Sequence, residues 1–451
     1  MMTRPLLISN GLTIDPKNNI HGIKHILISD GKILEISDNP IQPPQGTFNL
    51  DASNLIVAPG FIDLHCHLRE PGFEYKETIE SGTKAAAAGG FTTVCCMPNT
   101  EPPIDSAQVV KYIFEESRNS ATIRVLPIAN VTRGSKGLHL TDMGELADAG
   151  VIGFSDDGMP VSDPKILESA LTYSYDLNLP IINHCEDLRI SNKGSMNQGW
   201  VADKLGLKGI SPAAEESMVA RDIRLASITG GHCHIAHVST AGSVELIKRA
   251  KEDGINITSE VTPHHLTLTD ELIMGTSRQN EPLDKQSYNT NAKVNPPLRN
   301  PSDVDALLTA LNDGVIDLIA TDHAPHHISE KNCTFEEAAF GISNLETAVG
   351  SLFSLVNSKS TTIDKIIECL SDAPAKFLGE KRIGNLSRGS NADVTIIAPK
   401  EKWIVDSSQF FSKGVNSPIA GRELTGRIAA TIYNGQIVSQ QEKIGPGRES
   451  A

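Results

Sequence analysis

Histidine is the residue whose positions in this chain most clearly indicate chemistry. There are 14 histidines, and 11 of them fall in five short segments. The segments are His65–His67, Asn183–Cys185, His232–His237, His264–His265 and His323–His327. Imidazoles that cluster in this way, with aspartates nearby, are typical of sites that bind a divalent cation. The sequence therefore predicts a metal site assembled from distant parts of the chain.

His65 and His67 form the most specific local pattern. Side chains alternate between the two faces of a strand, so both rings would point to the same side. His184 and His237 each follow an apolar run and could bind a second ion, while Asp322 could both coordinate and carry protons. For any one of these histidines alone, packing in the core is the competing interpretation. Imidazole and carboxylate ligands suit Zn²⁺ best and also accept Mn²⁺ or Co²⁺.

Two adjacent aspartates, Asp156 and Asp157, leave the choice of a further ligand open. Either carboxylate could bridge two cations, and we favour Asp157. The competing interpretation is a plain turn, because Asp-Gly at 157–158 is a turn pair. One of His264 and His265 could face the site, although packing is the preferred interpretation. The other clustered histidines are expected to pack or to support loops, namely His232, His234, His323 and His327.

Apolar runs that end in polar residues recur through the middle of the chain. Eight of them are candidate strands, at 61–64, 91–97, 123–129, 151–154, 180–182, 234–236, 255–258 and 317–320. Helix-like stretches separate several of them, at 77–88, 106–116, 243–252 and 303–311. This alternation predicts the α/β class and a (β/α)₈ barrel of the TIM type, with chemistry at the C-terminal ends of the strands. An open, doubly wound sheet is the alternative, but chemical residues at so many strand ends favour closure.

The two ends of the chain show a different pattern, with short strands and tight turns. Asn10-Gly11, Asp30-Gly31 and Asn434-Gly435 are typical hairpin turns. We therefore expect a small composite β-domain from residues 1–58 and 381–451, and a catalytic barrel from residues 59–380. The polar segment 275–293 is expected to be an exposed loop, and a role as a lid is open.

Composition excludes several classes of function. The 451 residues carry 40 Lys and Arg against 55 Asp and Glu, a net charge of −15, which argues against general nucleic-acid binding. We find no apolar run of the ~18 residues that a membrane span requires, and the N-terminus lacks a signal-peptide pattern. The seven cysteines include no Cys-x-x-Cys. They are expected to be reduced core residues, and we place the protein in the cytoplasm.

Five motifs together resemble a known family. They are Pro59–Gly72 (which contains His65-Cys66-His67-Leu68-Arg69-Glu70), Met97–Thr100, Phe154–Gly158, Asn295–Arg299 and Asp322–His326. In this order they resemble the amidohydrolase superfamily and, within it, the long bacterial type I dihydroorotases. His-x-His alone marks only the superfamily, whereas the combination of motifs is specific. The resemblance covers nearly the whole chain, including the composite β-domain.

The resemblance implies the reversible hydrolysis of L-dihydroorotate to N-carbamoyl-L-aspartate in pyrimidine (UMP) biosynthesis, by a metal-activated hydroxide. It implies Zn²⁺ as the cofactor, one or two ions per subunit with two favoured. His65 and His67 would hold one ion and His184 and His237 the other. Asp157 would bridge the two, and Asp322 would be both a ligand and the general acid/base. The implied substrate contacts are His67, Arg69, Asn99, Asn295, His326 and the backbone at Phe340 and Gly341. A guanidinium such as Arg69 suits a substrate carboxylate.

Two other readings compete with this one. A hydantoinase-like or allantoinase-like ureide hydrolase resembles the group in which a carboxylated lysine bridges the metals from the fourth strand, but residues 151–160 contain no lysine. A catalytically silent partner of aspartate transcarbamoylase would be expected to lack metal ligands, whereas every ligand position here is filled. We expect a small-molecule substrate and a homo-oligomer without nucleic-acid or membrane partners. Association with a transcarbamoylase is open.

Overall fold

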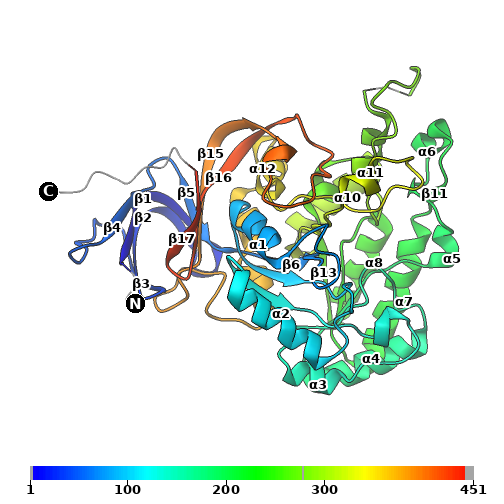
Figure 1. Ribbon diagram of the computed structural model, residues 1–451, viewed down its shortest axis with the longest axis horizontal. Helices are drawn as coiled ribbons and strands as arrows, with labels where there is room; N and C mark the ends of the chain where they lie inside the picture. The colour runs from blue at the N-terminus through cyan, green and yellow to red at the C-terminus, as the bar shows by residue number, and fades with distance from the viewer. Residues whose placement is uncertain (1–3, 277–278, 442–451) are drawn as a thin grey trace.

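Eight parallel segments close into a barrel in the larger part of the molecule (Figure 1). The structure is a computed structural model that describes residues 4–276 and 279–441. The barrel strands are β6 (Phe61–Cys66), β7 (Phe91–Cys96), β8 (Arg124–Pro127), β9 (Ile181–Asn183), β12 (Cys233–Ile235), β13 (Ile257–Val261) and β14 (Leu318–Ile319). A bridge between Cys66 and His323 joins the last segment to the first and completes the closure. The predicted barrel is therefore confirmed.

The fourth barrel segment is shorter than the sequence predicts. The sequence predicts a strand at residues 151–154, but only Phe154 pairs with its neighbours, through bridges to Ala129 and Ile181. The Phe154 amide donates to Pro180 O at 3.0 Å, and Phe154 O accepts from the Ile182 amide at 2.8 Å. One residue with both backbone groups paired is sufficient to close the gap between β8 and β9.

Helices surround the barrel on the outside (Figure 1). The four predicted helical stretches correspond to α1, α2, α8 and α10, with shifts of a few residues at their ends. Local signals explain the helix starts. Thr78 and Ser81 form a capping box on α1, and Asp163 caps α4, whose first residue is Pro164. The α-helices are α1 (Ile79–Ala88), α2 (Ala107–Ser120), α3 (Met143–Asp148), α4 (Pro164–Leu177), α5 (Leu188–Ser191), α6 (Trp200–Leu205), α7 (Ala213–Thr229), α8 (Ala241–Glu252), α9 (Pro263–Thr267), α10 (Pro301–Asn312), α11 (Ile328–Lys331), α12 (Ala348–Asn357), α13 (Ile363–Leu370) and α14 (Asp372–Phe377).

Apolar side chains fill the N-terminal half of the barrel interior. Strands β6 and β7 are buried along their whole length, as expected of parallel strands covered on both faces. Ile62, Leu64, Ile182 and Leu318 form one apolar cluster inside, and Ala375 of α14 packs against it. This packing places α14 across the N-terminal end of the barrel and leaves the C-terminal end for chemistry.

A second sheet is built from both ends of the chain and lies beside the barrel (Figure 1). Its strand order is β17-β16-β15-β5-β1-β2-β3, and β4 also pairs with β1. The strands are β1 (Leu6–Asp15), β2 (Ile20–Ser29), β3 (Lys32–Ser37), β4 (Phe48–Asp51), β5 (Ile56–Pro59), β15 (Val394–Ile404), β16 (Glu423–Tyr433) and β17 (Gln436–Gln440). The sheet has its own apolar core. The exact division at 58/59 and 380/381 stays a prediction, and residues 1–3 and 442–451 lie outside the described residues.

Two of the three predicted hairpin turns are confirmed, and one is wrong. Asp30-Gly31 joins β2 to β3, and Asn434-Gly435 joins β16 to β17. Asn10-Gly11 lies inside β1, where the pairing with β2 shifts register between Ile8 and Gly11. A Cβ atom at Gly11 would lie 2.4 Å from Val57 Cγ2. The glycine therefore serves a bulge and a close strand approach rather than a turn.

Two further observations bear on the predictions. Six cysteines are buried as predicted, but the prediction of a core position is wrong for Cys333, which is exposed, and no disulfide joins any of the seven, all of which the structure describes. Among residues 4–276 and 279–441, no helix is both long and apolar enough to cross a lipid bilayer.

Most of the segment 275–293 is exposed, as predicted, but Ala292 and Lys293 are buried and residues 277–278 lie outside the described residues.

Candidate metal centre

Six predicted ligands converge at the C-terminal end of the barrel. His65 is the fifth residue of β6 and His67 follows that strand, His184 follows β9, His237 follows β12, and Asp322 follows β14. Asp157 comes three residues after Phe154, which replaces the fourth strand. All six side chains are buried. Parallel strands that end at one rim bring together residues that are far apart in the sequence.

Asp157 lies at the middle of the four imidazoles. Its Oδ1 atom is 3.5 Å from His65 Nε2, 3.5 Å from His237 Nε2 and 3.7 Å from His184 Nδ1. Its Oδ2 atom is 3.5 Å from His67 Nε2. Oδ1 therefore faces three of the imidazoles and Oδ2 faces His67, a central position that is compatible with the predicted bridging role.

The neighbouring Asp156 points elsewhere. Its carboxylate accepts hydrogen bonds from the Thr132 amide at 3.0 Å and from Asn130 Nδ2 at 3.3 Å, and a further one from the Thr132 hydroxyl. Asp156 therefore ties together loops beside the fourth segment. Of the two aspartates that the sequence left open, only Asp157 faces the histidines.

The donor set fits a divalent cation. Two groups of potential ligand atoms each lie within 4.8 Å of one another, namely His65, Asp157 and His237, and His65, His67 and Asp322. Within the described residues, the buried atoms His65 Nε2, Asp157 Oδ1 and His237 Nδ1 have no hydrogen-bond partner. Leaving buried polar atoms unsatisfied costs about 1–3 kcal/mol each, so such a cluster is expected only where a ligand completes it.

A hydrogen-bond acceptor orients three of the four imidazoles. His65 Nδ1 lies 2.6 Å from Glu260 Oε1, and His67 Nδ1 lies 2.8 Å from Asn99 Oδ1. His184 Nε2 lies 3.4 Å from Glu186 Oε2. In each ring the other nitrogen faces Asp157. An acceptor on the far nitrogen fixes the ring tautomer and is a recurrent feature of metal-binding histidines.

Glu260 and Glu186 are the acidic residues that the sequence interpretation did not select. Glu260 is the fourth residue of β13 and is fully buried, with contacts to His65 and to His234 Nε2 at 3.2 Å. Glu186 also accepts from Asn295 Nδ2 at 2.8 Å. A single glutamate near a strand end carries no distinctive spacing, so only its partners in three dimensions identify it.

The backbone is strained at three of the site residues. Arg69, His237 and Asp322 have φ values of 62°, 33° and 47°, in the left-handed region that residues other than glycine and asparagine rarely adopt. Such strain clusters at functional sites, where the surrounding structure maintains it. Asp63 provides part of that support, because its carboxylate accepts from the Thr321 amide at 2.8 Å and from the Thr321 hydroxyl at 2.6 Å.

Asp322 is held as a carboxylate. Burial alone would raise its pKa, but a hydrogen bond with His67 and the charges of His65 and His67 outweigh burial and lower the pKa to about 2. Asp322 Oδ1 lies 3.2 Å from His67 Nε2 and 3.6 Å from His65 Nε2. An ionised oxygen at this position can bind a cation and can also accept a proton from a nearby water.

A cavity of about 220 Å³ opens above these ligands. Its volume is below the ~300–1,000 Å³ of pockets for drug-sized molecules, so it favours a compact substrate. Its walls include every residue predicted to contact substrate, namely His67, Arg69, Asn99, Asn295, His326, Phe340 and Gly341. Asp157, His184, His237 and Asp322 also line it, and His65 lies buried beneath.

Arg69 supplies the positive charge of this cavity. Its side chain is buried, and within the described residues no carboxylate lies within 4.0 Å of its guanidinium. Burial lowers its pKa, while Asp322 and Asp157 oppose that effect. Its Nε donates to Pro325 O at 3.3 Å. A buried guanidinium with no ion-pair partner is available for an anionic group of a ligand.

The remaining clustered histidines take other roles. His264 contacts Asn344, and His265 contacts Thr262 and the Pro296 carbonyl, so neither lines the cavity. His323 contacts Glu77, and His327 caps α11. His234 lies inside the barrel against Glu260. These placements agree with the packing and support roles expected for them.

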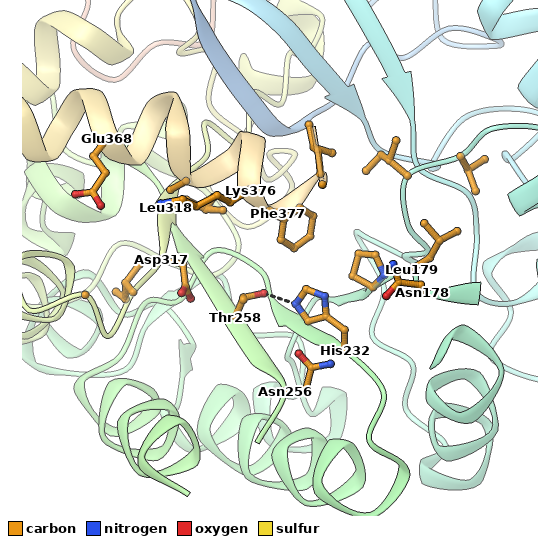
Figure 2. A pocket seen from close by; sticks show the side chains of 18 of the residues that line it. Asn178, Leu179, His232, Asn256, Thr258, Asp317, Leu318, Glu368, Lys376 and Phe377 are labelled. Atoms are coloured by element: carbon orange, nitrogen blue, oxygen red, sulfur yellow. Dashed lines mark hydrogen bonds between the residues drawn. The ribbon is translucent and has the colours of Figure 1, made fainter. Parts of the chain in front are cut away.

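A larger cavity of about 640 Å³ lies at the opposite end of the barrel, and Figure 2 shows the residues around it. Its lining includes the residues that precede four strands, namely Pro180, His232, Asn256 and Asp317. His232 points toward Thr258, with Nε2 2.8 Å from the Thr258 hydroxyl (Figure 2). Phe377 of α14 packs edge-on against the His232 ring. This end of the barrel holds polar residues but no cluster of potential metal ligands among the described residues.

Solved structures of known enzymes have the same fold as this chain. An L-hydantoinase (dihydropyrimidinase) from Arthrobacter aurescens superimposes with a TM-score of 0.84 at 23% identity, covering 98% of this chain and 97% of that chain. A dihydropyrimidinase from Brevibacillus agri superimposes with a TM-score of 0.82 at 21% identity, covering 97% and 95%. The chain therefore shares the fold of these two enzymes, a barrel with an attached β-sheet.

Sequence comparison identifies the family. Residues 54–243 match the family model described as dihydro-orotase-like. The chain is 46% identical to a dihydroorotase from Geobacter metallireducens, over 96% of this chain and 99% of the relative. It is 44% identical to a dihydroorotase from Syntrophus aciditrophicus, over 97% of this chain and 100% of that relative. The chain belongs to the dihydroorotase family.

Proposed function

We propose that this chain catalyses the reversible hydrolysis of L-dihydroorotate to N-carbamoyl-L-aspartate, a step of pyrimidine biosynthesis. The observation that carries the proposal is one compact cavity whose walls combine five of the six ligand groups with an unpaired guanidinium, while the sixth, His65, is buried beneath it. Relatives that share 44–46% identity over nearly the full chain are named dihydroorotase and support the same conclusion.

We propose Zn²⁺ as the cofactor, with two ions favoured. His65 and His67 would hold one ion, His184 and His237 the other, with Asp157 between them and Asp322 as a further ligand. When bound, the cation supplies Lewis-acid polarisation of the amide carbonyl and an acidified water molecule at neutral pH. The support in the chain is the pair of buried atoms His65 Nε2 and Asp157 Oδ1, which lie 3.5 Å apart and have no hydrogen-bond partner in the described part of the chain, within the two groups of potential ligand atoms.

The cavity walls would bind and orient the substrate. Dihydroorotate carries a carboxylate, and Arg69 can bind it through two parallel N–H bonds. Asn99, Asn295 and His326 would add hydrogen bonds, and the backbone at Phe340 and Gly341 would contact the ring. Burial, together with the charge of Arg69, lowers the pKa of His326 to about 2, so its neutral ring offers hydrogen bonds without a competing charge.

Asp322 would carry the proton. Its carboxylate would take a proton from the attacking water and deliver it to the departing ring nitrogen, and cyclisation would reverse these steps. The ionised state of Asp322 and its position between the histidines and the cavity support this role.

The decisive experiment is dihydroorotate hydrolysis by the purified protein, with metal content measured on the same sample. We expect hydrolysis that stops on chelation and returns with Zn²⁺. A panel of dihydroorotate, hydantoin and allantoin tests the ureide-hydrolase alternative, and preferred turnover of hydantoin or allantoin would contradict the proposal. A protein that takes up no metal and is inert in the panel would indicate the silent partner of a transcarbamoylase, whereas a fully metallated but inert protein would contradict the proposal.

Three properties extend this proposal without altering its chemistry. We propose a homo-oligomeric enzyme of the cytoplasm. Association with aspartate transcarbamoylase is a further proposal, and co-purification of the two enzymes would test it.

A further inference from the structure

One long connection links the small sheet to the wall of the substrate cavity. Residues 405–422, here called the strap, join β15 to β16 and extend from the small sheet over the barrel (Figure 1). Gly414 of the strap packs directly on the barrel, because a Cβ atom there would lie 2.4 Å from Pro325 Cβ. The strap is therefore fitted closely to the loop that follows Asp322.

Asn416 is the residue of the strap that bonds two parts of the cavity wall at once. Its side chain is 2% exposed. Nδ2 donates to Ala324 O at 3.1 Å and to Gly341 O at 3.0 Å, and Oδ1 accepts from the His326 amide at 3.0 Å. All three of these side-chain hydrogen bonds are made with backbone atoms of residues in the cavity wall.

The two parts of the cavity wall, residues 324–326 and residues 340–341, pack closely against each other. Ala324, His326, Phe340 and Gly341 all line the cavity, and His326 Nε2 donates to Phe340 O at 2.8 Å. Gly341 has a φ of 148°, and a Cβ atom at this position would lie 2.6 Å from Ala324 O. Asn416 itself does not line the cavity, so any effect that it has on the substrate passes through these residues.

We propose that Asn416 is a positioning residue that fixes the 324–326 loop against Gly341 and thereby sets the affinity for the substrate. The inference rests on the proposed function and deepens it, because it assigns the small sheet a part in substrate binding through the strap. Metal binding is expected to be independent of Asn416, since Asp322 is anchored separately by the bonds between Thr321 and Asp63.

The chain offers a matched control. Asn385 is 1% exposed, its Nδ2 donates to Lys381 O at 3.1 Å and Ile383 O at 2.9 Å, and its Oδ1 accepts from the Ser387 amide at 3.1 Å. It therefore makes the same three kinds of bond as Asn416, and its Oδ1 accepts one more from the Ser390 hydroxyl at 2.8 Å. Its neighbour Leu386 belongs to the core of the small sheet, away from the cavity. Loss of either amide should lower thermal stability, but only one of them touches the wall.

The test compares Asn416→Ala, Asn416→Asp and Asn385→Ala with the wild-type enzyme. We expect both Asn416 variants to raise the KM for L-dihydroorotate on the order of tenfold, with a kcat that changes much less. Metal content should equal that of wild type, and Asn385→Ala should lower the melting temperature without raising KM. The Asp variant keeps the acceptor for the His326 amide and nearly the same shape, so it provides a folded sample if the Ala variant is insoluble.

Three outcomes would overturn the inference. Asn416 variants with the KM of the Asn385 control would show that the strap does not act on the substrate. Loss of metal and kcat together with KM would show a general structural role. A metallated wild-type enzyme that does not hydrolyse dihydroorotate would contradict the proposed function and this inference with it, whereas an active wild type with unshifted variants overturns the inference alone.

Discussion

The two ends of the barrel hold two different kinds of cavity. The N-terminal end has the larger one, of about 640 Å³, and the C-terminal end has one of about 220 Å³. In the larger cavity the charged groups already have partners. Asp317 pairs with Lys251 at 2.7 Å, Lys376 with Asp372 at 2.6 Å, and Glu368 with Lys365 at 3.3 Å. At the smaller cavity, the facing atoms His65 Nε2 and Asp157 Oδ1 are buried and lack a hydrogen-bond partner among the described residues.

The candidate metal centre is therefore distinguished from the opposite cavity by buried ligand atoms without a hydrogen-bond partner, and not by a larger cavity volume. Backbone conformation agrees with this conclusion. At the N-terminal end the positive φ of Asn178 belongs to the C-cap of α4, where such a conformation is ordinary. At the C-terminal end positive φ falls on Arg69, His237 and Asp322, which have no such local reason. Strain and unpaired ligands occur together at one end only of the described barrel.

The largest expected effect comes from the two aspartates at opposite ends of one strand. Asp322→Asn removes the proposed proton carrier, and we expect kcat to fall about 10³-fold, within the range for general acid–base catalysis. Metal content should stay close to wild type because five ligands remain. Asp317→Asn, at the other end of β14, is the control and should leave kcat unchanged. Substantial activity in Asp322→Asn would refute the acid/base role.

The second effect concerns the charge that only the C-terminal cavity leaves unpaired. Arg69→Lys keeps the charge but loses the planar pair of N–H donors. We expect KM for dihydroorotate to rise on the order of 100-fold, because hydrogen bonds to charged groups contribute about 1.5–3 kcal/mol. Steady-state kinetics measure this change, and Lys376→Arg at the opposite end serves as the control. An unchanged KM would mean that the substrate carboxylate binds elsewhere.

The third effect concerns the acceptor that orients His65. Glu260→Gln removes the buried charge opposite His65 Nδ1, and we expect the affinity for Zn²⁺ to fall about tenfold, as is typical when such an acceptor is lost. Titration of the metal-free protein with Zn²⁺ measures this affinity without reference to activity. Glu368→Gln provides the comparison from the N-terminal cavity. Equal affinity of the Glu260 variant and wild type would contradict the orienting role.

Residue types and periodicity predicted the barrel and the convergence of the ligands, because both follow from local rules. Alternation along β6 brings His65 and His67 to one side, and parallel strands end at one rim. The sequence could not choose between Asp156 and Asp157, since the choice depends on Thr132 and Asn130, which bind Asp156 from a neighbouring loop.

Other features were beyond the reach of local rules because they depend on long-range contacts. The pattern Asn10-Gly11 predicts a turn, yet Gly11 is required by the approach of Val57 from another strand. Glu260 and Asn416 have no motif, and their partners are distant in sequence. The strap lies within the segment 381–451 that was assigned to the small β-domain, but its bonds reach the cavity wall. Such contacts appear only once the chain is folded.

The smallest expected effect concerns His232, which lies at the N-terminal end of the barrel, away from the candidate metal centre. Burial, and to a lesser degree the charge of His234, lowers the pKa of His232 to about 4. Between pH 4 and pH 6.5 the unfolded chain therefore binds more protons at this position than the folded chain, so stability decreases as the pH falls through this window. His232→Asn should remove this penalty and increase stability at pH 5 by about 1–2 kcal/mol relative to its effect at pH 7.5. Urea unfolding at the two pH values measures the difference. Dihydroorotate turnover by His232→Asn at neutral pH should stay at the wild-type level. The reason is that His232 is hydrogen-bonded to Thr258 and has no part in the chemistry at the other end of the barrel. A loss of turnover would show that the two ends are coupled.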